Sequence, residues 1–315
     1  MQMQMQDGHA APAARPGRGN GVSSWRAWIL AARPHTLTIG VNPVLVGCAL
    51  AWAETGRIDV GLMLLSMLGA LLLQTGTNLD NDVSDFERGT DRAGRLGLPR
   101  ATALGLLSPG QVRTASRACF VVATAIGLVL AWIGGWPIFV AGIASAAAAM
   151  AYSGGPRPIS YTPFGDFVVW LFFGLVAVTG SYYLQTLAVS PGVLVAATMV
   201  GLPASAVLVV NNYRDLDPDR AVGKRTLAVC FGRPFSRCQY AILMLVPFAL
   251  LPLLGLETRV GASLLVPLLA LPTALGLVRR FWHETPGPAF NAILAQTARF
   301  QVMFSVLLCV AILLV

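Results

Sequence analysis

Charged residues are scarce in this chain. Asp, Glu, Lys and Arg make up 11% of its 315 residues, against about 25% in a typical soluble domain. Hydrophobic residues make up 56%, and the mean hydropathy is +0.68. A soluble domain of this size needs enough polar surface to cover its core. The composition therefore excludes an ordinary soluble enzyme and a disordered protein.

Several common site motifs are also missing. The five cysteines include no C-x-x-C pair, which argues against a disulfide scaffold and a zinc site. No H-E-x-x-H or G-x-S-x-G occurs. Gly223-Lys224 lacks the upstream glycine of a P-loop, because Pro218 stands there. We expect the three scattered histidines to be structural or incidental.

Long apolar runs dominate what remains. A bilayer core needs about 20 apolar residues per helix, and only helices or closed barrels satisfy their backbone there. The runs are too long for barrel strands. The sequence therefore predicts an all-α polytopic membrane protein with nine transmembrane helices, at about 36–53, 60–80, 116–134, 137–153, 167–187, 192–211, 239–256, 260–278 and 297–315.

The basic residues predict the orientation of these helices. If the N-terminus is cytoplasmic, only Arg57 and Arg259 of the 22 lysines and arginines fall on the opposite side. The net charge of +8 is thus typical of a membrane protein, and we expect no nucleic-acid partner. We predict an inner (cytoplasmic) membrane protein with cytoplasmic active-site loops and its C-terminus on the other side. Residues 1–24 are expected to form a disordered tail, and 25–315 the transmembrane domain.

Acidic residues gather in two short segments. They read N-D-V-S-D-F-E-R-G-T-D at 81–91 and N-N-Y-R-D-L-D-P-D-R at 211–220, each where an even-numbered helix reaches the cytoplasm. Solvated loop residues are the plain alternative. Oxygen ligands from Asp and Asn suit Mg²⁺, and two facing clusters could hold metal ions that bind a diphosphate. The predicted metal ligands are Asn81, Asp82, Asp85, Asp91, Asp215 and Asp219.

Basic side chains lie beside both clusters. They could neutralise the phosphate charge that remains after metal binding. Each could equally be a cytoplasmic anchor that serves only the orientation of the chain. The candidates are Arg88, Arg95, Arg100, Arg157, Arg220, Lys224 and Arg225.

Taken together, the motifs N-D-x-x-D-x-x-x-G-x-D and N-N-x-R-D-x-x-x-D in a nine-helix protein resemble the UbiA superfamily of intramembrane prenyltransferases. The resemblance covers nearly the whole chain from Arg33. Three stretches look like the 1,4-dihydroxy-2-naphthoate prenyltransferases of menaquinone synthesis: A-R-P-H-T-L at 32–37, the run from Tyr152 to Gln185, and G-K-R-T-L-A-V at 223–229.

The resemblance implies a UbiA-like bundle and a Mg²⁺-dependent enzyme, with Mn²⁺ as a possible substitute. It would transfer a polyprenyl group from a polyprenyl diphosphate to an aromatic acid, expected to be 1,4-dihydroxy-2-naphthoate with decarboxylation. Gly94 replaces an acid found in the family, and Asp166 replaces the commoner Glu. Asp85, Asp215 and Asp219 would be catalytic, and the implied substrate-binding residues are Arg88, Arg100, Tyr152, Arg157, Arg220 and Lys224.

Three other hypotheses compete with this one. The acceptor could be 4-hydroxybenzoate, homogentisate or a haem precursor. A membrane transporter would use intramembrane acids as an ion path, but here the acids cluster at one face. A CDP-alcohol phosphotransferase also carries clustered aspartates, but in one continuous motif rather than in two distant segments.

Overall fold

Long apolar helices make up most of the part of the chain that the structure describes. The structure, a computed structural model, describes residues 24–89, 96, 97, 99–258 and 260–314. Within these residues nine helical segments are long and apolar enough to cross a membrane, so the predicted number is confirmed. The predicted tail lies outside the described residues, except for Ser24, which begins the first helix.

The helices follow the predicted runs in order, with short pieces at their ends and breaks. Three spans are composite: α6, a π-helical turn and α7 form one, α10 and α11 another, and a 3-10 segment with α12 the third. The helices are α1 (Ser24–Ala32), α2 (Pro34–Thr55), α3 (Val60–Glu87), α4 (Pro109–Gly134), α5 (Trp136–Ser153), α6 (Gly165–Trp170), α7 (Ala177–Thr186), α8 (Pro191–Arg214), α9 (Leu216–Ala221), α10 (Leu227–Ala249), α11 (Leu251–Glu257), α12 (Leu271–His283) and α13 (Phe290–Leu313).

Several helices continue beyond their apolar runs. Helix α3 extends to Glu87 rather than ending near residue 80, and α10 begins at Leu227 rather than near 239. Side-chain caps mark where three helices begin. Asp59 accepts a hydrogen bond from the backbone of α3, Ser108 from that of α4, and Thr226 from that of α10. Because α3 continues to Glu87, the predicted site residues Asn81 and Asp85 lie in its last turns.

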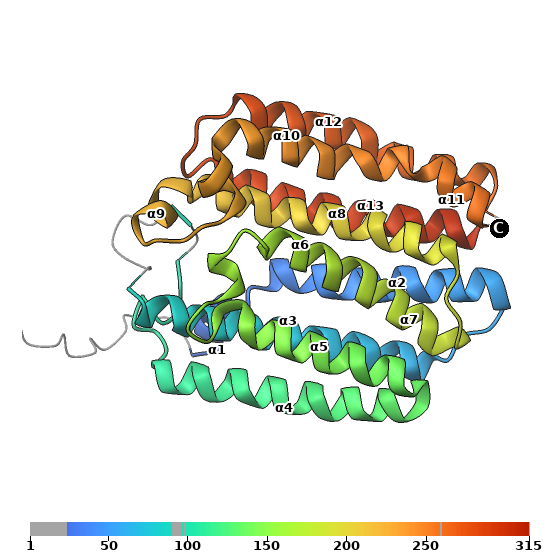
Figure 1. The fold of residues 1–315 in the computed structure, drawn as a ribbon, viewed down its shortest axis with the longest axis horizontal. Coiled ribbons are helices and arrows are strands. Elements are labelled where there is room, and N and C mark those ends of the chain that lie inside the picture. Colours follow the sequence, from blue (N-terminus) through green and yellow to red (C-terminus); the bar gives the residue numbers. More distant parts are fainter. Residues whose placement is uncertain (1–23, 90–95, 98, 259, 315) are drawn as a thin grey trace, which may run out of the picture.

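The spans lie side by side along one direction (Figure 1). The span of α8 is the most enclosed. In its most apolar 18-residue stretch 72% of the residues are buried, against 61% for α2 and 11% for α3. Large apolar side chains of α4 and α5 face outward instead, such as Trp132 and Trp136 at 91% and 77% exposure. Such a surface suits contact with lipid.

Two glycines allow the composite α6–α7 span to approach α8 closely. A Cβ added at Gly201 would lie 2.8 Å from the Cα of Gly174 and 2.8 Å from the carbonyl oxygen of Trp170. Gly174 lies in the π-helical turn Leu171–Val176, which interrupts the span beside α8. Small residues at a crossing are what permits such packing in membranes.

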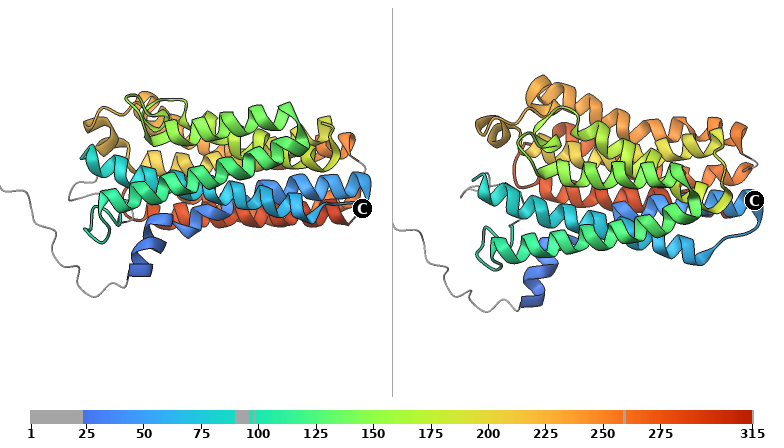
Figure 2. Two further views of the ribbon diagram at one scale, coloured as in Figure 1. Left: turned by 90° about the horizontal axis from the view of Figure 1, so that it is seen from below. Right: turned by 60° about the horizontal axis from the view of Figure 1, so that its bottom comes forward.

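Polar loops gather at one end of the bundle, which we call the α9 end. Figure 1 places α9 there, and Figure 2 shows α1 projecting from the same end across the direction of the spans. The C-terminal part of α13 lies at the opposite end (Figure 1). The C-terminal ends of α3 and α8 lie at the α9 end, so Asp85 and Asp215 are at the same end of the bundle.

Candidate functional site

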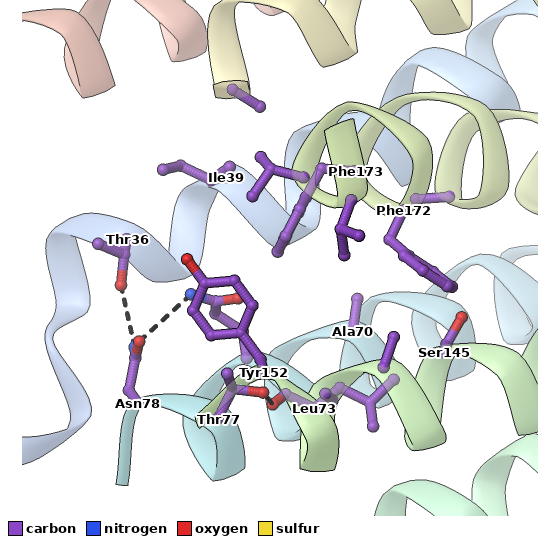
Figure 3. Close-up of a pocket in the computed structure, with 18 of the residues that line it drawn as sticks. Thr36, Ile39, Ala70, Leu73, Thr77, Asn78, Ser145, Tyr152, Phe172 and Phe173 are labelled. Carbon is purple, nitrogen blue, oxygen red and sulfur yellow. Dashed lines mark hydrogen bonds between the residues drawn. The ribbon is translucent and has the colours of Figure 1, made fainter. Parts of the chain in front are cut away.

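A cavity of about 860 Å³ opens among helices α2 to α8. Asn81, Asp85 and Asp215 line it at the α9 end, whereas apolar and small residues of α3, α4, α5 and α7 line the rest. Figure 3 shows the ring of Tyr152 projecting into it, on the side where Asn78 bonds Thr36. The cavity thus joins a polar mouth to an apolar interior.

The first acidic segment forms one hydrogen-bonded group. Asn81 and Asp85, one turn apart on α3, are joined at 3.2 Å. Arg100 donates to both, at 2.7 Å to Asn81 Oδ1 and 2.6 Å to Asp85 Oδ2. Arg33 donates to Asn81 Oδ1 at 3.1 Å, and Asn81 donates to Ser153 Oγ at 3.0 Å. These bonds fix Asn81 and Asp85, two of the predicted metal ligands, at the cavity wall.

Other predicted residues of this segment lie elsewhere. Asp82 is 1% exposed, and its carboxylate accepts a long bond of 3.4 Å from the backbone of Thr102. It is not among the described residues that line the cavity. Asp91, Gly94 and Arg95 lie outside the described residues. Metal binding by Asp82 and Asp91 therefore stays a prediction.

An arginine holds the first acid of the second segment. Arg214 clasps Asp215 with two bonds, from Nε at 2.8 Å and from Nη2 at 2.6 Å. It also donates at 2.7 Å to Asn211 and at 2.7 Å to Asn291. Arg214 is 2% exposed, so this fork is a buried one. Asp215 therefore has a fixed orientation at the cavity mouth.

Asp219 completes the second segment from α9. Lys224 Nζ lies 3.1 Å from its carboxylate, and Lys224 also lines the cavity. Burial raises the pKa of Asp219 above its ordinary value, Lys224 opposes this, and the nearby carboxylates of Asp215 and Asp85 add to the increase. Asp85 of the first segment and Asp215 of the second both line the cavity, whereas Asp219 is not among the described residues that line it.

Tyr161, in the loop after α5, lies between two of the predicted basic residues. The guanidinium carbon of Arg88 is 5.2 Å and the ammonium of Lys224 is 4.9 Å from the centre of its ring. Arg88 also donates to the carbonyl oxygens of Ser153 and Gly155. Tyr161 therefore connects the end of α3 with the loop that follows α9.

Arg157 and Arg220 are exposed, and neither is among the described residues that line the cavity. Arg220 makes only a long bond of 3.5 Å to the carbonyl oxygen of Val229. Arg225 donates its backbone N–H to Tyr161. Arg100, Lys224 and Tyr152 line the cavity. Substrate contact by any of these residues stays a prediction.

The amide and carboxylate oxygens of the two acidic segments are suited to a Mg²⁺ ion that is also bound by substrate phosphates. Among the described side chains, no three of the His, Cys, Asp and Glu residues gather closely enough to hold a metal ion by themselves. Proteins usually bind Mg²⁺ through one or two carboxylates together with water and substrate phosphates. Asn81 with Asp85, and Asp215 with Asp219, fit that pattern.

The comparison with known families decides the relationship. The UbiA prenyltransferase family matches residues 41–314. The chain belongs to this family. Among curated UbiA-family relatives, the 1,4-dihydroxy-2-naphthoate octaprenyltransferase of Escherichia coli is 33% identical over 93% of this chain and 97% of its own. The enzyme of the same name from Mycobacterium leprae is 36% identical over 90% and 95%.

Solved structures share the fold of this UbiA-family chain. A UbiA homolog from Archaeoglobus fulgidus bound to DMAPP and Mg²⁺ has a TM-score of 0.64 at 17% identity, over 92% of this chain and 99% of that one. A UbiA homolog from Aeropyrum pernix K1 has a TM-score of 0.66 at 15% identity, over 88% and 97%. The predicted UbiA-like bundle is thereby confirmed.

Sequence reasoning missed four residues of this UbiA-family site. Arg33 and Arg214 had been counted only as cytoplasmic anchors, although Arg214 directly precedes Asp215. Tyr161 stands in one of the stretches that pointed to the subfamily, but no role followed from it. Asn291 carries no local signal, because its partners lie far away in the sequence.

Proposed function

We propose that this protein transfers a polyprenyl group from a polyprenyl diphosphate to 1,4-dihydroxy-2-naphthoate, with loss of CO₂, in menaquinone biosynthesis. Several relatives of that named activity, at 30–36% identity over most of the chain, support it. The single structural observation that carries the proposal is that Asp85 of one acidic segment and Asp215 of the other both line the polar mouth of an apolar cavity.

The diphosphate of the donor would bind at this mouth together with Mg²⁺. Asn81, Asp85, Asp215 and Asp219 would hold the metal, and Mn²⁺ would substitute for it. When bound, the metal supplies positive charge that stabilises the departing diphosphate. Each carboxylate of this set already has a basic partner, so the mouth is suited to an anion that carries several charges.

The chain's own cations would assist the departure of the diphosphate. Arg100 and Lys224 line the cavity beside the acids, and Arg88 is held next to Lys224 through Tyr161. Positively charged donors aimed at the phosphate oxygens stabilise the charge that builds as the C–O bond breaks. Arg157 and Arg220 would join them once substrate is bound.

The apolar part of the cavity would hold the prenyl chain and exclude water. Loss of diphosphate leaves an allylic cation, which water would quench. Tyr152 and Phe173 present aromatic rings to this space (Figure 3). Aromatic faces attract cations without reacting as water does.

The aromatic acceptor would then attack the cation. A new carbon–carbon bond forms at the ring carbon that carries the carboxylate. The carboxylate departs as CO₂ and leaves its bonding electron pair to the ring, which regains aromaticity. No strong base is needed at that carbon.

The orientation follows from the basic residues. We propose that the chain lies in an inner (cytoplasmic) membrane, with the α9 end facing the cytoplasm and the C-terminus on the opposite side. Soluble acceptor and magnesium would then reach the mouth directly from the cytoplasm.

One experiment tests the reaction. Purified protein is incubated with Mg²⁺, labelled farnesyl or longer diphosphates and a panel of aromatic acids, and the products are identified by mass. We expect a prenylated, decarboxylated naphthalenediol and no product in EDTA. A product from 4-hydroxybenzoate alone would contradict the acceptor, and full turnover in EDTA would contradict the metal.

A further inference from the structure

Asn291, at the start of α13, uses both ends of its side-chain amide. Its Oδ1 accepts from Arg214 Nη1 at 2.7 Å, and its Nδ2 donates to the carbonyl oxygen of Leu96 at 2.9 Å. These partners are 77 and 195 positions away in the sequence. Asn291 is not among the described residues that line the cavity, so it does not face substrate.

The Arg214 side of this contact leads to the second acidic segment. Arg214 clasps both oxygens of Asp215 and also bonds Asn211. A buried guanidinium satisfied by three neighbours has little freedom to rotate. Loss of the Asn291 side-chain oxygen would therefore remove one of the three contacts that hold Arg214.

The Leu96 side leads to the first acidic segment. Arg100 lies four residues beyond Leu96, and the intervening Pro99 has a restricted backbone. Arg100 donates to Asp85 and to Asn81, as described above. Holding the carbonyl of Leu96 therefore restrains the backbone that delivers Arg100 to Asp85.

We propose that Asn291 and Arg214 are positioning residues that join the two acidic segments into one binding unit. The bonded path runs from Asp215 through Arg214 and Asn291 to Leu96, and along the chain to Arg100 and Asp85. Ordering of one segment is thereby transmitted to the other, so that both segments respond together to a metal-bound diphosphate. This inference rests on the proposed function.

The chain offers a selective variant. Asn291→Asp keeps an oxygen that accepts from Arg214, but it loses the N–H that donates to Leu96. Asn291→Ser is a second variant that loses the same long donor with a smaller side chain. Gln296→Ala is the matched control, because Gln296 lies on the same helix and bonds exposed Arg280 at 3.0 Å.

Hydrogen exchange of the full-length protein in detergent reports on each segment separately. The probe is Mg²⁺ with inorganic pyrophosphate. In the wild-type protein we expect slower exchange in peptides covering 99–107 and 211–221. In Asn291→Asp only 211–221 should remain protected, and the apparent Kd for the probe should rise about 5-fold or more. The control should behave as wild type.

The outcomes separate the two proposals. Protection of both peptides in either Asn291 variant, with an unchanged Kd, would overturn the bridge and leave the proposed function intact. A wild-type protein that is neither protected by the probe nor active with prenyl diphosphates would contradict the proposed function and this inference with it. Should Asn291→Asp fail to fold, Asn291→Ser replaces it; its shorter side chain loses both long bonds, so we expect weaker protection of both peptides.

Discussion

Arg100 Nη2 and Asp85 Oδ2 form a buried ion pair of 2.6 Å, with side-chain exposures of 6% and 5%. They belong to different elements, since Asp85 lies in the last turn of α3 and Arg100 follows in the loop before α4. Breaking such a pair leaves a buried charge without compensation. Substitutions here should therefore preserve the hydrogen bond if they are to test chemistry rather than folding.

Asp85→Asn is the substitution that meets this requirement. Asparagine still offers Arg100 an oxygen, but it removes the negative charge that we propose for metal binding. We expect turnover to fall by at least about 10²- to 10³-fold, and the melting temperature to fall as well, because Arg100 keeps a hydrogen bond but loses its counter-charge. Steady-state assays and melting curves in detergent would check this.

Asp217→Asn provides the matched control. Its side chain is 65% exposed and pairs with Arg233 on the surface. Exposed pairs of this kind contribute little to stability. We expect near wild-type turnover, and wild-type activity in Asp85→Asn would refute the assigned role of Asp85.

Magnesium affinity should depend on pH through Asp219. Burial raises the pKa of this carboxyl above its ordinary 3.8, so its ionised form is lost at a higher pH than in a free aspartate. A metal ligand must be deprotonated, so apparent Mg²⁺ affinity should be highest above the raised pKa and should fall as the pH decreases through it. Titrations of activity against Mg²⁺ at several pH values measure this.

The competition between protons and metal supplies the check on that prediction. Excess Mg²⁺ should move the acid limb of the activity profile to lower pH. An acid limb that does not move with Mg²⁺ concentration, in protein shown to remain folded, would count against Asp219 as a ligand.

Tyr161→Leu should weaken binding of the prenyl diphosphate. It removes the ring that lies against Arg88 and Lys224, and contacts of a cation with an aromatic face are worth enough to raise KM between about 2- and 30-fold. We expect KM for the aromatic acceptor to be unchanged. Tyr161→Phe keeps the ring, so its KM for the prenyl diphosphate should stay near that of the wild type. An equal increase of this KM in both variants would assign the role to the hydroxyl group instead.

Gly201→Ala should destabilise the crossing of α8 with the π-helical turn. Its methyl would meet the backbone of Gly174 and Trp170 at 2.8 Å, and overpacking of this kind costs about 1–3 kcal/mol. Gly276→Ala on α12 meets open space and should be neutral or stabilising. Thermal unfolding compares the two, and equal melting temperatures would contradict the tight crossing.

The number and order of the spans were predictable because each crossing needs an uninterrupted apolar run. Their ends were not, because helices such as α3 and α10 continue into polar sequence that hydropathy does not detect. The capping side chain of Thr226 marks the start of α10, but serine and threonine are too common for this signal to stand out alone.

The position of the proposed acidic ligands at one end of the bundle was predictable for a similar reason. Asn81 with Asp85, and Asp215 with Asp219, recur at helical spacing within short segments. Arg33 and Asn291 were not, since each reaches the site from a distant part of the chain. Spacing along the sequence does not predict contacts that form only when helices pack together.

The backbone of Arg33 has a consequence for how this protein could be stabilised. Arg33 precedes α2 in a left-handed conformation, with φ 53° and ψ 69°. A side chain in that region costs roughly 1–2 kcal/mol that glycine would avoid. Arg33→Gly would relax this turn and at the same time delete the cation that bonds Asn81. Optimisation for thermal resilience and optimisation for turnover therefore favour opposite residues at this position.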